Sequence, residues 1–228
     1  MAWNFADQIH ALTGYDADST SDSETGEDFN LLANQWLVDA AREVINILPS
    51  KLKMKCSKVT NLYIGNTDTT MDLDDKGEIL YVTRENANSG YYIGCREVSP
   101  LLADSANDST SLHYATATDP IYWTESNSSG NATLFVNPTP DSNQPAKVMH
   151  IAHPSIAYGD TSIANFPDEA EYLVPLRAAI TAAEYQLAIE EDVEIYLPII
   201  SNLKQEYQQG VLALQTGSFI PPQQQKGR

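Results

Sequence analysis

The C-terminal quarter of the chain predicts two consecutive amphipathic helices, and this pattern constrains the fold more than any other feature. Apolar residues recur there at steps of three and four, the spacing that lines one face of a helix. The first seam comprises Leu173, Leu176, Ile180, Ala183 and Leu187, and the second comprises Tyr196, Ile200, Leu203, Tyr207, Val211 and Leu214. We therefore expect a helical hairpin over residues 161–216, followed by an extended tail over residues 217–228.

Two features qualify the first of these helices. Its many alanines give high helix propensity and little bulk, so a neighbouring helix can approach closely. Pro175 predicts either a kink in the first turns or a start further along the chain.

The N-terminal part, residues 1–58, also has a helical pattern. A short amphipathic segment ends at Gly14 and is followed by an acidic loop over residues 15–28. A stronger helical stripe, which Pro49 ends, is formed by Leu37, Ala41, Val44 and Leu48. We expect this part to pack with the C-terminal hairpin.

A cluster of lysines follows Pro49. Four of the 13 basic residues lie within eight positions, namely Lys51, Lys53, Lys55 and Lys58. Their alternation with apolar residues predicts an edge strand with one cationic side. Either this side resists aggregation, or it binds the acidic surface of a neighbouring subunit. The second interpretation makes these lysines, with Arg177 and Glu184 of the hairpin, candidates for inter-subunit contacts.

Residues 59–160 are rich in short strand signals. Runs of aromatic and β-branched residues alternate with clusters of Gly, Asn, Asp and Pro, which predicts six or seven antiparallel strands. The runs are NLYIG, EILYVT, GYYIGCREV, SLHYATA, PIYWTES, ATLFVNP and KVMHIAHP. The fold class is therefore α+β: a helical bundle made from the N-terminal helix and the C-terminal hairpin, an inserted antiparallel β sandwich or barrel, and an extended C-terminal arm.

Charge and composition exclude several classes of protein. A net charge of −18 disfavours tight nucleic-acid binding, which depends on Lys and Arg, although an acidic wall lets DNA pass without adhesion. No stretch approaches the roughly 20 apolar residues of a membrane span. Cys56 and Cys95 are far apart in the sequence and are expected to be free thiols.

The residues give no sign of catalytic chemistry. The acidic run at residues 72–78 has Lys76 where a calcium loop needs an oxygen ligand. His150 and His153 fall on opposite faces of a predicted strand and are expected to be structural. We expect no enzyme activity, no cofactor and no bound metal.

The helical segments resemble the head-to-tail connector, or adaptor, proteins of tailed bacteriophages. The resemblance lies in ANQWLVDAAREVINILPSKL, in DTSIANFPDEAEYLVPLRAAITAAEYQLA and in EEDVEIYLPIISNLKQEYQQGVLAL. It implies a virion protein of the phage neck, made in the host cytoplasm, that forms a ring, commonly a dodecamer. Such a ring joins the portal protein to the next neck or tail component and extends the DNA channel.

The resemblance also implies a role for the tail. The C-terminal arm of such proteins reaches into the portal, and apolar anchors, two prolines and terminal charges suit this role. The docking candidates are Phe219, Ile220, Pro221, Pro222, Lys226 and Arg228.

Two alternatives remain open at this point. One is another virion part, such as a stopper, a tail terminator or a baseplate module. The other is a glycan- or ligand-binding β module with helical flanks, in which an exposed aromatic platform would be formed by Tyr91, Tyr92, Tyr122 and Trp123.

Overall fold

The chain has a mixed α+β fold that divides into two compact units. The computed structural model describes residues 3–15, 29–74, 76–86, 89–126, 130–190 and 192–216. The helical unit comprises residues 1–56 and 154–228, and the β unit comprises residues 57–153. None of the described helices has the length and hydropathy that crossing a bilayer requires.

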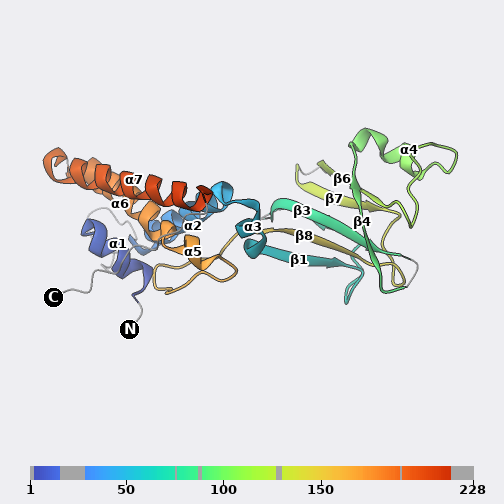
Figure 1. The fold of residues 1–228 in the computed structure, drawn as a ribbon, viewed down its shortest axis with the longest axis horizontal. Helices are drawn as coiled ribbons and strands as arrows, with labels where there is room; N and C mark the ends of the chain where they lie inside the picture. The colour runs from blue at the N-terminus through green and yellow to red at the C-terminus, as the bar shows by residue number, and fades with distance from the viewer. Residues whose placement is uncertain are drawn as a thin grey trace. The chain divides into compact units, whose positions relative to one another are not determined.

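Helix α6 is the element against which the rest of the helical unit packs. The elements of this unit are α1 (Phe5–Thr13), α2 (Phe29–Ile47), α3 (Ser50–Lys53), the 3-10 helix η1 (Met54–Cys56), α5 (Asp168–Glu171), α6 (Leu173–Glu190) and α7 (Val193–Thr216). Helices α1, α2 and α7 all contact α6, and α6 and α7 run side by side in Figure 1.

The burial of α6 differs from the single apolar seam that we predicted. Its first eleven residues are buried on almost every side, the buried ones being Leu173, Val174, Pro175, Leu176, Ala178, Ala179, Ile180, Ala182 and Ala183. A helix that is apolar all round is a central helix rather than a surface one. The alanines allow this position, because small side chains let three neighbouring helices approach.

Pro175 neither shifts the helix start beyond itself nor interrupts the helix interior. The helix is interrupted earlier, at Tyr172, which lies between α5 and α6. Pro175 is the third residue of α6, where a backbone N–H has no acceptor within the helix, so the missing donor costs little.

Helix α7 has the predicted seam. Tyr196, Ile200, Leu203 and Leu214 are buried, while Tyr207 and Val211 are half-buried. The helix begins at Val193 and ends at Thr216, the last residue of the predicted hairpin.

The lysine cluster does not form the predicted edge strand. Residues 50–56 are helical, as α3 and η1, and strand β1 begins only at Ser57. Pro49 has extended dihedral angles and precedes the first turn, and the N–H groups of Leu52 and Lys53 donate to its carbonyl. This local turn outweighs the alternation of Lys with apolar residues. Of the four lysines, only Lys58 lies in a strand.

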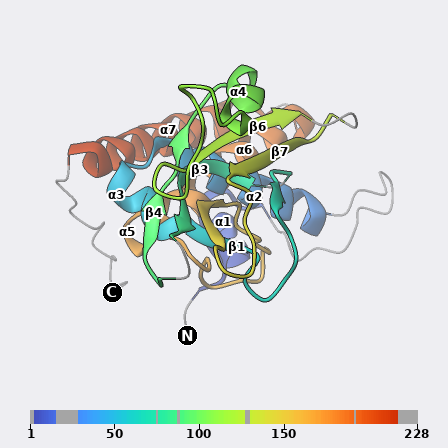
Figure 2. The ribbon, with the colours of Figure 1, turned by 90° about the vertical axis from the view of Figure 1, so that its right-hand side faces the viewer.

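The β unit contains two open four-stranded sheets and no closed barrel among its described residues, so the barrel alternative is wrong. The strands are β1 (Ser57–Leu62), β2 (Thr70–Asp72), β3 (Lys76–Glu85), β4 (Tyr92–Gly94), β5 (Arg96–Glu97), β6 (Ile121–Ser126), β7 (Ala132–Asn137) and β8 (Ala146–Ala152). The sheet orders are β1-β8-β3-β4 and β2-β7-β6-β5. All pairs are antiparallel except β5 with β6, and Figure 2 shows β6 and β7 side by side.

Residues from both sheets form one core, so the sheets pack face to face as in a sandwich. The cluster contains Leu62, Met71, Val82, Tyr122, Leu134, Val136, Ala146 and Val148. A second cluster, Ala106, Ala115, Ile121 and Trp123, lies beneath the 3-10 helix η2 (Pro100–Leu102) and α4 (Ala103–Asn107).

Two strand predictions in this unit are wrong. Residues 111–117 form turns rather than a strand, because nearby polar side chains form hydrogen bonds with backbone groups that a strand would pair with a neighbour. For example, the Ser111 hydroxyl accepts from the His113 N–H at 3.1 Å. The run GYYIGCREV is not one strand. It divides at Cys95 into β4 and β5, which belong to different sheets.

Replacing Gly210 with alanine should destabilise the helical unit. A Cβ at this position would lie 2.6 Å from Leu173 Cδ2 and 2.6 Å from the Tyr172 hydroxyl oxygen. Overpacking costs about 1–3 kcal/mol, whereas the gain in helix propensity is about 0.5–1 kcal/mol. Urea unfolding followed by helical circular dichroism should show a net loss, with exposed Gln209→Ala as the control. Equal or greater stability of Gly210→Ala would contradict the close approach.

His150 is a structural residue of the β unit, as predicted. It is almost fully buried, with Nδ1 2.9 Å from the Ile151 carbonyl oxygen and Nε2 3.0 Å from Thr60 Oγ1. Since a carbonyl only accepts, Nδ1 carries the proton and Nε2 accepts from the Thr60 hydroxyl. Burial lowers the pKa of His150 below its ordinary value of 6.5, and the charges of Lys76 and Lys58 lower it further.

This environment predicts a pH dependence of stability. Below pH 6.5 the unfolded chain binds a proton that folded His150 binds only at lower pH, so the free energy of unfolding falls as the pH drops. Denaturant titrations between about pH 5 and pH 7 should show this slope in the parent chain and a smaller slope in His150→Gln. The exposed His113→Gln variant is the control and should keep the parent slope; an unchanged slope in His150→Gln would refute the assignment.

Candidate functional site: contact surfaces of the helical unit

The turn between α6 and α7 carries an unusual concentration of exposed apolar side chains. Four of them are each more than half exposed, namely Ile189, Val193, Ile195 and Leu197. We call residues 189, 190 and 192–197 the hairpin tip. Glu190, Asp192 and Glu194 lie among these residues, so the hairpin tip is both apolar and acidic.

The hairpin tip is held by local polar contacts and by Tyr196, which is buried against Ala183 and Ile200. The Tyr196 hydroxyl donates to Glu190 Oε2 at 2.7 Å, and the Ile195 N–H donates to Asp192 Oδ1 at 3.3 Å. The hydrogen bond to Glu190 and burial raise the pKa of Tyr196 to about 12. These contacts define the turn and leave the four apolar side chains facing outward. Sequence reasoning did not identify this surface. The alternation of acidic and apolar residues at 189–197 is the signal that could have indicated it.

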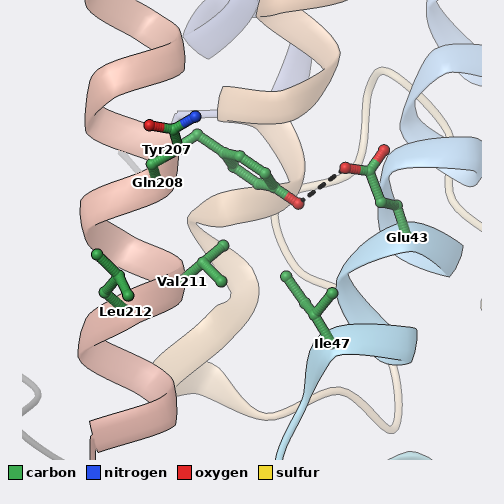
Figure 3. Close-up of a pocket in the computed structure, with 6 residues that line it drawn as sticks. All are labelled: Glu43, Ile47, Tyr207, Gln208, Val211 and Leu212. Atoms are coloured by element: carbon green, nitrogen blue, oxygen red, sulfur yellow. Dashed lines mark hydrogen bonds between the residues drawn. The ribbon is translucent and has the colours of Figure 1, made fainter.

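A second apolar surface lies between α2 and α7. Figure 3 shows the groove, with Glu43 and Ile47 on α2 facing Tyr207 and Val211 on α7. The groove has a volume of about 360 Å³, and Leu212, which is 59% exposed, forms part of its rim. Its walls are mainly hydrocarbon, so it suits an apolar side chain of another molecule rather than a charged ligand.

A polar network closes one side of this groove. The Tyr207 hydroxyl donates to Glu43 Oε1 at 3.2 Å, and Arg177 Nε donates to Glu43 Oε2 at 2.8 Å. Arg177 also donates from Nη1 to the Thr181 hydroxyl at 2.9 Å. Burial and the Glu43 charge raise the pKa of Tyr207, so its hydroxyl stays a donor at neutral pH. The network joins α2, α6 and α7.

The residues predicted for inter-subunit contact are partly engaged within the chain. Arg177 pairs with Glu43, Glu184 Oε1 lies 2.7 Å from Lys204 Nζ, and Lys55 Nζ lies 2.9 Å from Glu169. The Lys55 ammonium lowers the pKa of Glu169. The Lys204–Glu184 and Lys55–Glu169 pairs are exposed, and exposed pairs contribute only about 0–1 kcal/mol, so another subunit could replace these two at small cost. The Arg177 side chain is half-buried.

The other lysines of the cluster are distributed over two elements. Lys51 is exposed and Lys53 is half-buried on α3, whereas Lys58 is exposed on β1. Met54, between Lys53 and Lys55, is 55% exposed. The docking tail that we predicted, which contains Phe219, Ile220, Pro221, Pro222, Lys226 and Arg228, lies outside the described residues.

The aromatic platform considered for a glycan-binding module does not form. Tyr122 and Trp123 are each only 8% exposed, and Trp123 stacks on Phe135 with ring centroids 5.5 Å apart. Tyr91 is exposed, while Tyr92 lies beneath Lys147 Nζ at 3.9 Å. Tyr122 and Trp123 are neighbours on β6 and so lie on opposite faces of the strand, and both faces are covered: Tyr122 belongs to the core shared by the two sheets, and Trp123 to the cluster with Ala106 and Ala115.

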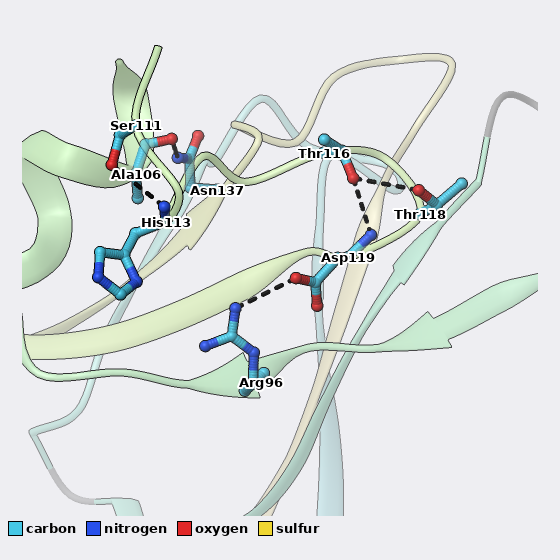
Figure 4. Close-up of polar contacts among 8 residues, drawn as sticks. All are labelled: Arg96, Ala106, Ser111, His113, Thr116, Thr118, Asp119 and Asn137. Atoms are coloured by element: carbon cyan, nitrogen blue, oxygen red, sulfur yellow. Dashed lines mark hydrogen bonds and ion pairs between the residues drawn. The ribbon is translucent and has the colours of Figure 1, made fainter. Parts of the chain in front are cut away.

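Polar contacts hold the long connection between β5 and β6 (Figure 4). Arg96 Nη2 donates to Asp119 Oδ2 at 3.1 Å, and the buried Asn137 Nδ2 donates to the Ala106 carbonyl at 3.1 Å. These hydrogen bonds join polar groups of the connection to each other and to the strands beside it. They serve the fold of the β unit.

The described residues offer little for metal chemistry or thiol catalysis. No group of three or more His, Cys, Asp or Glu side chains gathers among them in a way that could hold a metal ion. Both cysteines are free thiols, as predicted. Burial raises the pKa of Cys56 to about 11 and that of Cys95 to about 12, so neither is an activated nucleophile.

Comparisons with models of known protein families and with curated proteins found no match for this chain.

The groove can be tested by thiol labelling. A maleimide should modify Leu212→Cys rapidly, because that position is exposed, and should modify Leu214→Cys slowly, because Leu214 is buried in the same helix. The native cysteines should react slowly, since their raised pKa values leave few thiolates near neutral pH. Mass spectrometry of the labelled peptides gives the rates. Similar rates for the two variants would mean that α7 does not have this exposed side.

Proposed function

We propose that this chain is a structural adaptor of the tailed-phage neck, which forms a ring between the portal protein and the next neck or tail component. In this proposal the helical parts form a bundle that packs side by side around the ring. The C-terminal arm at residues 217–228 reaches into the portal, and DNA passes through the lumen. The proposal rests on the sequence resemblance of the helical segments and on the contact surfaces described above.

The observation that supports this role best is the exposed apolar surface of the helical unit. Four apolar side chains at the hairpin tip and the groove between α2 and α7 remain in contact with water. Exposed hydrophobic patches on folded proteins are typical of sites that bind other macromolecules. A protein that acts through its contacts, rather than through a reaction, needs such surfaces.

The charge of the chain suits a DNA channel. Each copy carries −18, so a ring of many copies would have strongly negative walls that repel phosphate groups. The same charge opposes ring closure, because like charges repel, and apolar contacts between neighbours would have to offset it. Closure of the full ring is therefore expected on the portal, whereas isolated copies should associate only weakly, through single contacts at high concentration.

The tail provides the direct test. The chain truncated after Thr216 should lose binding to the portal protein encoded in the same genome, because the proposed apolar anchors are absent. Biolayer interferometry would measure the affinity, with an expected loss of at least about 100-fold, or about 2.7 kcal/mol. A Gln224→Ala variant is the matched control within the tail and should bind as the parent does. Unchanged melting of the truncated chain would separate lost docking from lost folding, and undiminished portal binding would refute the role of the arm.

A further inference from the structure

The helical unit presents two surfaces with complementary chemistry. The hairpin tip combines exposed Ile189, Val193, Ile195 and Leu197 with Glu190, Asp192 and Glu194. The segment formed by α3 and η1 combines exposed Met54 with Lys51, Lys53 and Lys55. Each surface therefore has apolar side chains among charges of one sign, and the signs are opposite.

The basic surface is distinctive for its part of the molecule. Across the described residues of the helical unit the basic side chains are Arg42, Lys51, Lys53, Lys55, Arg177 and Lys204. Three of these six lie within five positions, at Lys51, Lys53 and Lys55, so α3 and η1 hold the main concentration of positive charge. Lys55 pairs with Glu169, as Arg177 and Lys204 pair with glutamates elsewhere in the unit. An acidic surface of another molecule would be attracted to this segment more than to any other described part of the unit.

The two surfaces lie at opposite ends of α6. Lys55 is bonded to Glu169 of α5, immediately before α6 begins, whereas the hairpin tip starts where α6 ends. Eighteen residues of helix separate these ends by about 27 Å. Figure 1 shows the same arrangement, with α5 near α3 and the turn from α6 to α7 at the far end. One copy therefore cannot bring its own two surfaces together.

We propose that the hairpin tip of one copy of this chain docks on the α3–η1 segment of the next copy. The contact is head-to-tail, because each surface repels its own kind and attracts the other. Head-to-tail contacts generate rings when the rotation closes and filaments when it does not. The contact rests on the proposed ring and deepens it, since it names the two faces through which neighbours meet.

A mixing experiment tests the contact. The tip variant carries Val193→Asp and Leu197→Asp, and the basic-segment variant carries Lys51→Glu and Met54→Glu. All four positions are exposed, so both variants should fold, which circular dichroism would check. Sedimentation velocity at about 100 µM would measure association, a concentration at which contacts of micromolar affinity are occupied.

The expected result is specific to a head-to-tail contact. The parent chain associates, each variant alone associates at least about tenfold more weakly, and an equimolar mixture of the variants forms a 1:1 dimer. The mixture recovers one contact, because the tip variant keeps an intact basic segment and the other variant keeps an intact tip. Gln209→Glu adds a negative charge to α7 away from the tip and should associate as the parent does.

Several outcomes would overturn the proposed contact. A parent chain that stays monomeric at this concentration, variants that associate as strongly as the parent, or a mixture without a dimer would each do so. Variants that associate normally would leave the ring intact and refute only these two faces. Recovery in the mixture without any portal binding by the parent would instead support the contact and refute the neck role.

Discussion

The close packing of α1, α2 and α7 around α6 is the constraint on which the helical unit depends. Five alanines lie along α6 between Ala178 and Ala188, and those of its first three turns are fully buried. Small side chains allow the helix backbones to approach closely. The helices are then held by many short van der Waals contacts between backbones and methyl groups, and not by large side chains. Gly210 on α7 continues this arrangement, since even one methyl group would meet Leu173 and Tyr172. The exposed surfaces are therefore carried on a tightly packed support.

The helical unit pairs acidic side chains with its few basic ones. Glutamates are placed against the few cations, as in the contact of Glu43 with Arg177 and that of Glu184 with Lys204. Each exposed pair adds little free energy, but together they reduce the repulsion inside an acidic chain. The lysines of α3 and η1, of which Lys55 pairs with Glu169, are the densest group of positive charges among the described residues of the helical unit. An acidic chain with one basic segment and one acidic, apolar tip has the elements needed to associate with itself in one orientation.

The candidate surfaces were only partly accessible to sequence reasoning. The lysine cluster and the hairpin were evident from spacing, yet the cluster proved helical because Pro49 and Ser50 start a turn. The groove was not foreseen, since Ile47 and Val211 come from helices far apart in the sequence, and Ile47 lies outside the predicted stripe of its helix. The burial of Tyr122 and Trp123 depends on cover over both faces of β6: Tyr122 packs in the core between the sheets, and Trp123 packs with Ala106 and Ala115.

Local patterns in the sequence identify the main helices and most of the strands, but not the helical state of the lysine cluster or the turns at 111–117. Apolar periodicity, Gly14 and Pro49 act over a few residues, so α1, α2 and α7 follow from local physics. Only the tertiary structure decided that α6 is central, that the strand run at 90–98 divides between two sheets, and that β5 pairs in parallel with β6. Such outcomes depend on contacts between distant segments, and the free energy of those contacts is not encoded in any local pattern.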